Sequence, residues 1–93
     1  MNSDSEMERR IADTIARASS RIRALRRERG LTVQGLADRC EMERSNLCRI
    51  EAGRTNMTLR TLCTVCFAME VELSDLLAEE RTDAAESARK RGK

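Results

Sequence analysis

The chain has 93 residues, which is the size of one small domain. Hydrophobic residues make up 40% of it, but Phe67 is the single aromatic residue and proline is absent, so we expect an all-α domain. Histidine is absent as well, which excludes the usual general base, the nucleophile pairs that depend on it and every histidine-containing metal site.

No apolar run approaches the roughly 20 residues that a membrane-spanning helix requires. The first ten residues, MNSDSEMERR, are polar and acidic and do not resemble a signal peptide. We therefore expect a cytoplasmic protein with no membrane partner.

Positive charge is concentrated in the middle of the chain, although the net charge is only +2. Residues 17–60 contain 11 arginines, no lysine and five acidic residues, which is a local charge of +6 and leaves −4 for the rest. Phosphate-binding proteins concentrate charge in this way, and a solvated helical surface is the alternative interpretation.

The first predicted element is a helix whose apolar residues recur at spacings of four, three, four and three: Ile11, Ile15, Ala18, Ile22 and Leu25. The pair Ser19-Ser20 is suited to cap a new helix. The apolar stripe therefore belongs either to one helix over residues 7–29 or to a short helix followed by a second one over 19–29. The first six residues are expected to be disordered.

Four further helices are expected after Gly30: residues 33–40, 44–52 and 59–69, and a short last helix that starts at Leu73 or after Ser74. Thr32 and Thr58 precede two of these helices and are suited to cap their first amides. Gly53 ends the helix over 44–52. The inward positions are expected to form the core: Leu36, Ala37, Cys40, Met42, Leu47, Ile50, Leu59, Leu62, Val65, Cys66 and Met69.

The chain divides into three expected parts. Residues 1–18 form a partly helical extension, residues 19–78 form the domain, and residues 79–93 form a charged tail. The tail extends the last helix, frays or is disordered, and its composition is compatible with each of these outcomes.

The segment over residues 31–62 contains two short amphipathic runs, a Glu-x-Gly stop, a polar loop and another apolar repeat, which is the pattern of a helix-turn-helix. Six short motifs stand in order around it: Ile22-Arg23-Ala24-Leu25-Arg26, Gly30-Leu31-Thr32, Leu36-Ala37, Leu47-Cys48-Arg49-Ile50-Glu51-Ala52-Gly53, Leu59-Arg60-Thr61-Leu62 and Leu73-Ser74-Asp75-Leu76-Leu77. With these motifs the chain resembles the phage repressor and Cro-like helix-turn-helix family, also called the XRE family, over residues 20–77. The resemblance implies a compact five-helix domain, with the helix-turn-helix at the second and third helices, that binds double-stranded DNA.

Five positions depart from the family pattern: Glu41 replaces a frequent glycine in the turn, Val33 a glutamine, Glu43 a capping serine, Cys48 a small polar residue and Met57 a proline. Glu41 restricts the turn if that position requires a positive φ. The departures concern the turn and single contacts rather than the fold.

The resemblance implies that Arg44, Ser45 and Arg49 read bases from the third helix. With Leu47 and Ile50 facing inward, these three residues lie on the outer side of the helix. Arginine suits the O6 and N7 acceptors of guanine, so we expect guanine in each half-site. Asn46 lies between the two faces and reaches either a base edge or a phosphate. The phosphate contacts are expected from Thr32, Gln34, Arg54, Thr55, Asn56 and Arg60. We also expect Glu51 to be tied to an arginine of the first helix such as Arg26.

Four cysteines are present, and two of them form the C-x-x-C pattern Cys63-Thr64-Val65-Cys66. Zinc would need further ligands from Cys40 and Cys48, both of which lie in the helix-turn-helix. We favour packing of reduced thiols over a zinc site or a redox sensor, and expect neither a metal nor a cofactor. Cys48 is the thiol whose oxidation would affect DNA binding.

The predicted function is a sequence-specific transcriptional regulator, a repressor that binds an inverted-repeat operator as a homodimer. The alternative is an antitoxin-type protein that binds a protein partner as well as its own operator, and an enzyme is disfavoured. Two surfaces are candidates for the dimer interface: the stripe of Ile11, Ile15 and Ala18, and the last helix with Leu73, Leu76 and Leu77. We favour the last helix.

Overall fold

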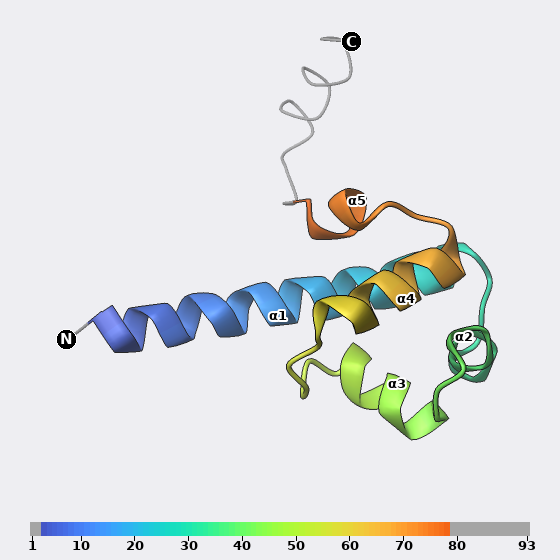
Figure 1. Ribbon diagram of the computed structural model, residues 1–93, viewed down its shortest axis with the longest axis horizontal. Helices are drawn as coiled ribbons and strands as arrows, with labels where there is room; N and C mark the ends of the chain where they lie inside the picture. Colours follow the sequence, from blue (N-terminus) through green and yellow to red (C-terminus); the bar gives the residue numbers. More distant parts are fainter. Residues whose placement is uncertain (1–2, 79–93) are drawn as a thin grey trace, which may run out of the picture.

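Five α-helices make up most of the structure, a computed structural model that describes residues 3–78 (Figure 1). They are α1 (Ser3–Glu28), α2 (Val33–Cys40), α3 (Arg44–Glu51), α4 (Leu59–Met69) and α5 (Leu73–Leu77). No strand occurs within residues 3–78, so the prediction of an all-α fold is confirmed. In Figure 1, α2 and α3 lie below α1, α4 crosses in front of it and α5 lies above it.

The first helix is continuous across the serine pair, which decides between the two predicted arrangements in favour of one long helix. The prediction that the first six residues are disordered is wrong for residues 3–6, which belong to α1, whereas residues 1–2 lie outside the described part. The N-terminal half of α1 extends beyond the other helices (Figure 1). Of its predicted apolar stripe, Ala18, Ile22 and Leu25 are buried in the domain, whereas Ile11 is 42% exposed.

Helix α1 ends in a turn that redirects the chain into α2. The amide of Leu31 donates to the carbonyl of Arg26 at 3.1 Å, and Gly30 has a φ of 68°, where a glycine is free of the steric cost of a Cβ. Thr32 then caps α2, as predicted, because its Oγ1 accepts a 2.9 Å hydrogen bond from the amide of Gly35.

The turn between α2 and α3 places Glu41 in the left-handed region with a φ of 57°. The amide of Met42 donates to the carbonyl of Ala37 at 3.0 Å, so the turn has the hydrogen bonds of a glycine-terminated helix. A glutamate at this position is strained by the contact of its Cβ with the backbone. The turn keeps the geometry of a helix-turn-helix in spite of this residue.

The core lies where α1 meets the other helices: Ile22, Leu25, Leu36, Ala37, Cys40, Leu47, Ile50, Val65, Cys66, Met69 and Leu76 are buried. Met42 and Leu62 are half-buried against it. The predicted burial of Leu59 is wrong, because its side chain is 64% exposed. Leu59 is the first residue of α4, after the Thr58 cap, and lies on the same line of the helix as the exposed Cys63.

Helix α5 is the last helix of the described residues. Leu76 is buried in the domain core, Leu73 is half-buried, and Leu77 is 40% exposed. The predicted tail over residues 79–93 lies outside the described residues. Within residues 3–78, no helix has both the length and the apolar character needed to cross a membrane.

Candidate nucleic-acid interface

The inner side of α3 attaches this helix to the domain. Leu47 and Ile50 are one turn apart and both are buried. Helix α3 packs against both α1 and α2, and these contacts restrict the movement of α3 in two directions. With Leu47 and Ile50 facing inward, the exposed positions of α3 are Arg44, Ser45, Cys48 and Arg49.

A buried ion pair fixes α3 to α1, as predicted. The Nε and Nη2 atoms of Arg26 donate to the two carboxylate oxygens of Glu51 at 2.6 and 3.0 Å. Nη1 of Arg26 also donates to the carbonyl of Leu31 at 2.9 Å, so one guanidinium connects α1, the loop before α2 and α3. The side chains of Arg26 and Glu51 are 10% and 8% exposed. The hydrogen bond to Glu51 raises the pKa of Arg26 above its usual value.

The outer side of α3 carries the predicted base-reading residues. Arg44, Ser45 and Arg49 are all exposed. Among the described residues, neither Arg44 nor Arg49 has an ion-pair or hydrogen-bond partner, so both guanidiniums are available for a ligand. Asn46 is half-buried, and its Nδ2 lies 3.8 Å from the sulfur of Met42, which draws its side chain towards the turn. Their role in reading bases stays a prediction.

Two predicted phosphate-binding residues lie at the start of α2. Thr32 is exposed and uses its Oγ1 as the acceptor for the helix cap, so its hydroxyl proton is free to donate to an anion. Gln34 is exposed, but its Nε2 donates to Asp38 at 2.8 Å within α2. A phosphate contact from this amide would have to share or replace that hydrogen bond.

The loop after α3 holds the remaining predicted phosphate-binding residues. Arg54 is exposed, and its backbone amide donates to the carbonyl of Arg49 at 3.0 Å, which places it at the end of α3. Thr55 is half-buried and Asn56 is exposed in the same loop, whereas the exposed Arg60 lies in the first turn of α4. These residues therefore belong to two elements, and only the loop is attached directly to α3.

Two arginines that the sequence analysis did not single out lie beside α3. Arg23 and Arg27 of α1 line a depression of about 310 Å³ together with Cys48 and Ala52. Both arginines are exposed and flank the buried Arg26 along the helix. Their positions near Arg26 in the sequence could have predicted this placement. The arginine that pairs with Glu51 brings its neighbours on α1 close to α3. Cys48, predicted to lie near the DNA face, is exposed in this depression.

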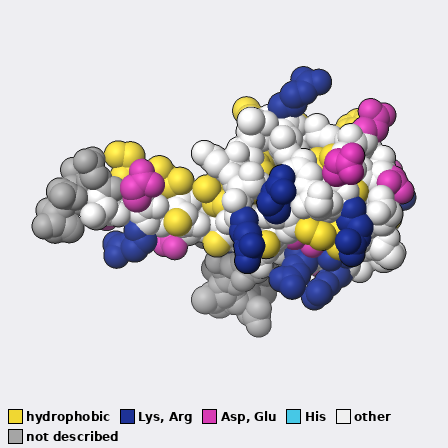
Figure 2. All heavy atoms as spheres, turned by 90° about the horizontal axis from the view of Figure 1, so that it is seen from below, with side chains coloured by type: hydrophobic (Ala, Val, Ile, Leu, Met, Phe, Trp, Pro, Cys, Tyr) yellow, Lys and Arg dark blue, Asp and Glu magenta, His cyan; other side chains and the backbone are white. Residues whose placement is uncertain are grey.

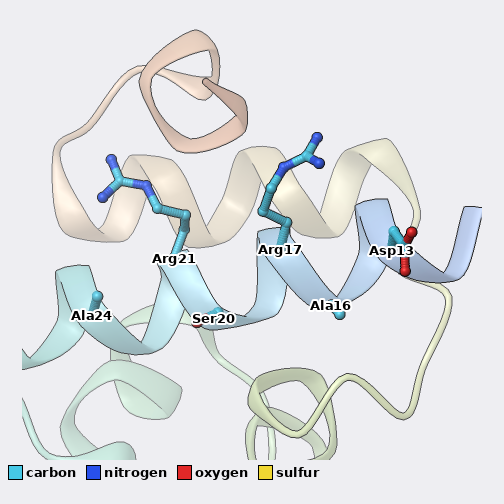
Figure 3. A pocket seen from close by; sticks show the side chains of 6 residues that line it. All are labelled: Asp13, Ala16, Arg17, Ser20, Arg21 and Ala24. Atoms are coloured by element: carbon cyan, nitrogen blue, oxygen red, sulfur yellow. The ribbon is translucent and has the colours of Figure 1, made fainter. Parts of the chain in front are cut away.

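The positive charge of residues 17–60 is divided between two sides of α1. Figure 3 shows Arg17 and Arg21 pointing from α1 towards α5, into a separate depression of about 570 Å³. Nη2 of Arg21 donates to the carbonyl of Asp75 at 3.2 Å. Figure 2 shows clusters of basic side chains on the face seen from below, where Figure 1 places α2 and α3. The local charge of the sequence therefore overstates the charge available beside α3.

Two of the four cysteines pack in the core and two are exposed. Cys40 and Cys66 are buried, and burial raises the pKa of both thiols. Cys48 and Cys63 are exposed. No group of three or more metal-ligating side chains comes together in the described part of the chain.

Residues 17–85 match the family described as helix-turn-helix domain. The chain belongs to this family. Its members are DNA-binding transcriptional regulators, and the resemblance stated from the sequence motifs is confirmed.

Individual relatives of this helix-turn-helix protein agree with the assignment. The immunity repressor protein of Bacillus phage phi105 is 42% identical over 60 residues, which are 64% of this chain and 42% of that protein. The chain therefore spans less than half the length of this relative. The restriction-modification controller protein C.AhdI from Aeromonas hydrophila has a TM-score of 0.64 and 27% identity, covering 67% of this chain and 94% of that one. The hypothetical transcription factor NHTF from Neisseria has the same fold, with a TM-score of 0.71 and 23% identity over 85% and 86% of the two chains.

Proposed function

We propose that this helix-turn-helix protein is a transcriptional repressor that binds an inverted-repeat operator as a homodimer and has no enzymatic role. The observation that carries the proposal is the contrast between the two sides of α3. Its inner side is fixed by the buried Arg26–Glu51 pair, and its outer side presents the unpaired Arg44 and Arg49. A short helix that is fixed on one side and cationic on the other is suited to the major groove.

Base reading is assigned to the exposed side chains at the start and in the second turn of α3. Arg44 and Arg49 each offer a planar fork of donors that matches O6 and N7 of guanine. Ser45 lies beside Arg44 and is able to donate to or accept from a base edge. Asn46 contributes from the border of this surface. The operator half-site is accordingly expected to contain guanine.

Phosphate binding is assigned to residues on both sides of α3. Thr32 and Gln34 at the start of α2 contact one stretch of backbone, and Arg54, Thr55, Asn56 and Arg60 contact the next. Arg23 and Arg27 of α1 are added to this set because they line the depression beside α3. Contacts of this kind fix the position of the domain on the duplex and make its affinity depend on salt.

Selection of bound duplexes from a random pool, followed by affinity measurements over a range of salt concentrations, tests the proposal. The expected result is one enriched inverted repeat with guanine in each half, whose centres are separated by about 10 base pairs. Arg44→Ala and Arg49→Ala should each weaken binding to this duplex by about 1–3 kcal/mol.

The matched control for these variants is Arg17→Ala, which removes the same charge on the side of α5 (Figure 3). It should weaken binding much less than either α3 variant. Equal losses in all three proteins, or a pool without any enriched sequence, would contradict sequence-specific reading by α3.

A further inference from the structure

An uncovered apolar stripe runs along α4 and takes no part in the proposed DNA surface. It consists of Leu59, Cys63 and Phe67, which are four residues apart and therefore lie on one line of the helix. Phe67 is 86% exposed and Leu59 is 64% exposed, the two highest values among the large hydrophobic side chains of the described residues. The only aromatic residue of the chain is thus presented to solvent. Exposed apolar stripes of this kind mark interaction surfaces.

We propose that this stripe is the dimer interface and that α4 packs antiparallel against α4 of a second copy, with the two Cys63 residues at the two-fold axis. The spacing is self-complementary, because Leu59 and Phe67 are equally far from Cys63 in opposite directions. A two-fold axis through Cys63 therefore brings Leu59 of one copy onto Phe67 of the other, twice. The proposal rests on the dimeric repressor proposed above and names the surface that this dimer uses.

The charges at the two ends of α4 favour a second copy in this orientation. Arg60 stands at the N-terminal end. Glu70 and Glu72 stand at the C-terminal end together with Arg39, whose Nη1 donates to the carbonyl of Ala68 at 3.2 Å. All four side chains are exposed. Antiparallel packing opposes the helix dipoles and keeps the two Arg60 side chains apart, whereas parallel packing would align the dipoles and bring the two Arg60 side chains together.

The arrangement of the helices is compatible with binding of both copies to one duplex. In Figure 1, α4 lies at the front of the molecule with no other described helix drawn before it, and α3 lies at its lower side. A two-fold axis running from the α5 side to the α3 side of this view relates the two antiparallel α4 helices. Both α3 helices then lie on the same side of the dimer, as an inverted repeat requires.

The two surfaces considered from the sequence are less suited to this role. Leu76 of α5 is buried in its own core and is not available to a partner. In the stripe of α1, Ala18 is buried as well, Ile15 is half-buried, and Ile11 is 42% exposed. The α1 stripe is the rival interface, and it supplies the matched control.

Analytical ultracentrifugation of the full chain without DNA is the first test. Phe67→Ser is expected to weaken dimerisation at least about tenfold, because it removes a central aromatic contact on each copy. Ile11→Ser makes an equivalent exposed apolar side chain polar on α1 and should leave the dimer unchanged. Both positions are exposed in the monomer, so circular dichroism should show the helix content of the unaltered chain in both variants. A chain that stays monomeric, or a dimer disrupted by Ile11→Ser but not by Phe67→Ser, would overturn the proposal.

Cross-linking through Cys63 is the second test and reports the orientation. In a Cys48→Ser background, Cys63 is the remaining exposed thiol, whereas Cys40 and Cys66 are buried. Diamide should join two chains by a disulfide: the two thiols lose two electrons and two protons, which the diazene takes up to become a hydrazine. A short bis-maleimide should join the same positions, since packed helix axes lie only about 8–10 Å apart. Cys63→Ser with Cys48 retained is the control and should give no covalent dimer.

A dimer that neither reagent joins through Cys63 overturns the antiparallel register. The outcomes also separate this proposal from the function proposed above. If the α4 interface is wrong, α3 still binds the selected duplex in the Phe67→Ser protein with the affinity of the unaltered chain. If the DNA-reading function is wrong, the chain dimerises through Cys63 and enriches no duplex.

Discussion

The inner and outer sides of α3 use similar residue types for opposite purposes. On the inner side, Arg26 reaches α3 from α1 and is buried, with all three of its nitrogens donating hydrogen bonds. On the outer side, Arg44 and Arg49 are exposed and have no partner among the described residues. The difference teaches that stability and recognition are separable on this helix, so a substitution on one side should affect one property and leave the other largely intact.

The largest expected effect is on the inner side. Glu51→Ala leaves the guanidinium of Arg26 buried without its carboxylate, and should lower the free energy of unfolding by about 3 kcal/mol, measured by urea denaturation. The double variant Arg26→Met with Glu51→Leu leaves no unpaired charge and should recover part of this loss. An unfolding midpoint of Glu51→Ala equal to that of the unaltered chain would show that the pair contributes no stability.

The second prediction concerns the outer side and separates charge from geometry. Arg49→Lys keeps the positive charge but loses the planar fork, so the preference for guanine over other bases should fall by about 1–3 kcal/mol. The salt dependence of binding and the stability of the fold should stay unchanged. Competition between duplexes that differ at one base measures the preference. Arg17→Lys is the matched control, and an equal loss there would break the distinction between the two sides.

A third prediction concerns the turn that joins α2 and α3 and tests whether Glu41 strains it. Glu41→Gly removes the Cβ from a residue with a φ of 57° and should raise the free energy of unfolding by about 1 kcal/mol. The sequence preference of DNA binding should not change, because the turn keeps its hydrogen bonds. Glu41→Ala is the control, since it loses the same charge but retains the strain. Equal stability of the two variants would assign the effect to charge.

The smallest expected effect is the change of stability with pH that the two buried thiols cause. Burial raises the pKa of Cys40 and Cys66. The folded state therefore holds these protons more tightly than the unfolded state. The resulting stability is present below the unfolded thiol pKa of about 8.5 and is lost as the pH rises through the higher folded values. Urea midpoints should fall slightly in this range.

The reactivity of the thiols tests directly which cysteines are buried and which are exposed. A thiol reagent at neutral pH should modify Cys48 in the folded protein and reach Cys40 and Cys66 only on unfolding. Mass spectrometry of the modified chain identifies the sites. Modification of Cys40 at the same rate as Cys48 would show that the core does not protect Cys40.

Much of the fold was accessible from the sequence because the decisive signals are local. Thr32 and Thr58 cap their helices as predicted, since a cap depends on a side chain and amides within three residues. The link between Glu51 and an arginine of the first helix is the exception, because it joins residues 25 positions apart; it was predicted and is present at 2.6 Å. The membership in the phage repressor-like family followed from motif order rather than from any single residue.

The features that were missed depend on contacts between distant parts of the chain. Ser19 is a residue type that often caps helices, but it lies in the middle of α1. Its side chain is buried, and its hydroxyl has no hydrogen-bond partner among the described residues. It lies against the end of α3, where a Cβ on Gly53 would stand 3.8 Å from its Oγ. Arg23 and Arg27 were missed for the same reason, because their position beside α3 follows from the packing of α1. The base-reading and phosphate-binding assignments themselves stay predictions.

The triple attachment of Arg26 has a consequence for the thermodynamics of recognition. One guanidinium holds the end of α1, the carbonyl of Leu31 and the carboxylate of Glu51 together, so α3 has little freedom to tilt or rotate about its own axis. The loss of orientational entropy that accompanies docking of a mobile helix has then already occurred on folding. In the proposed DNA complex, a mismatched base would not be accommodated by a small rotation of α3, and the cost of the mismatch would fall on the hydrogen bonds themselves.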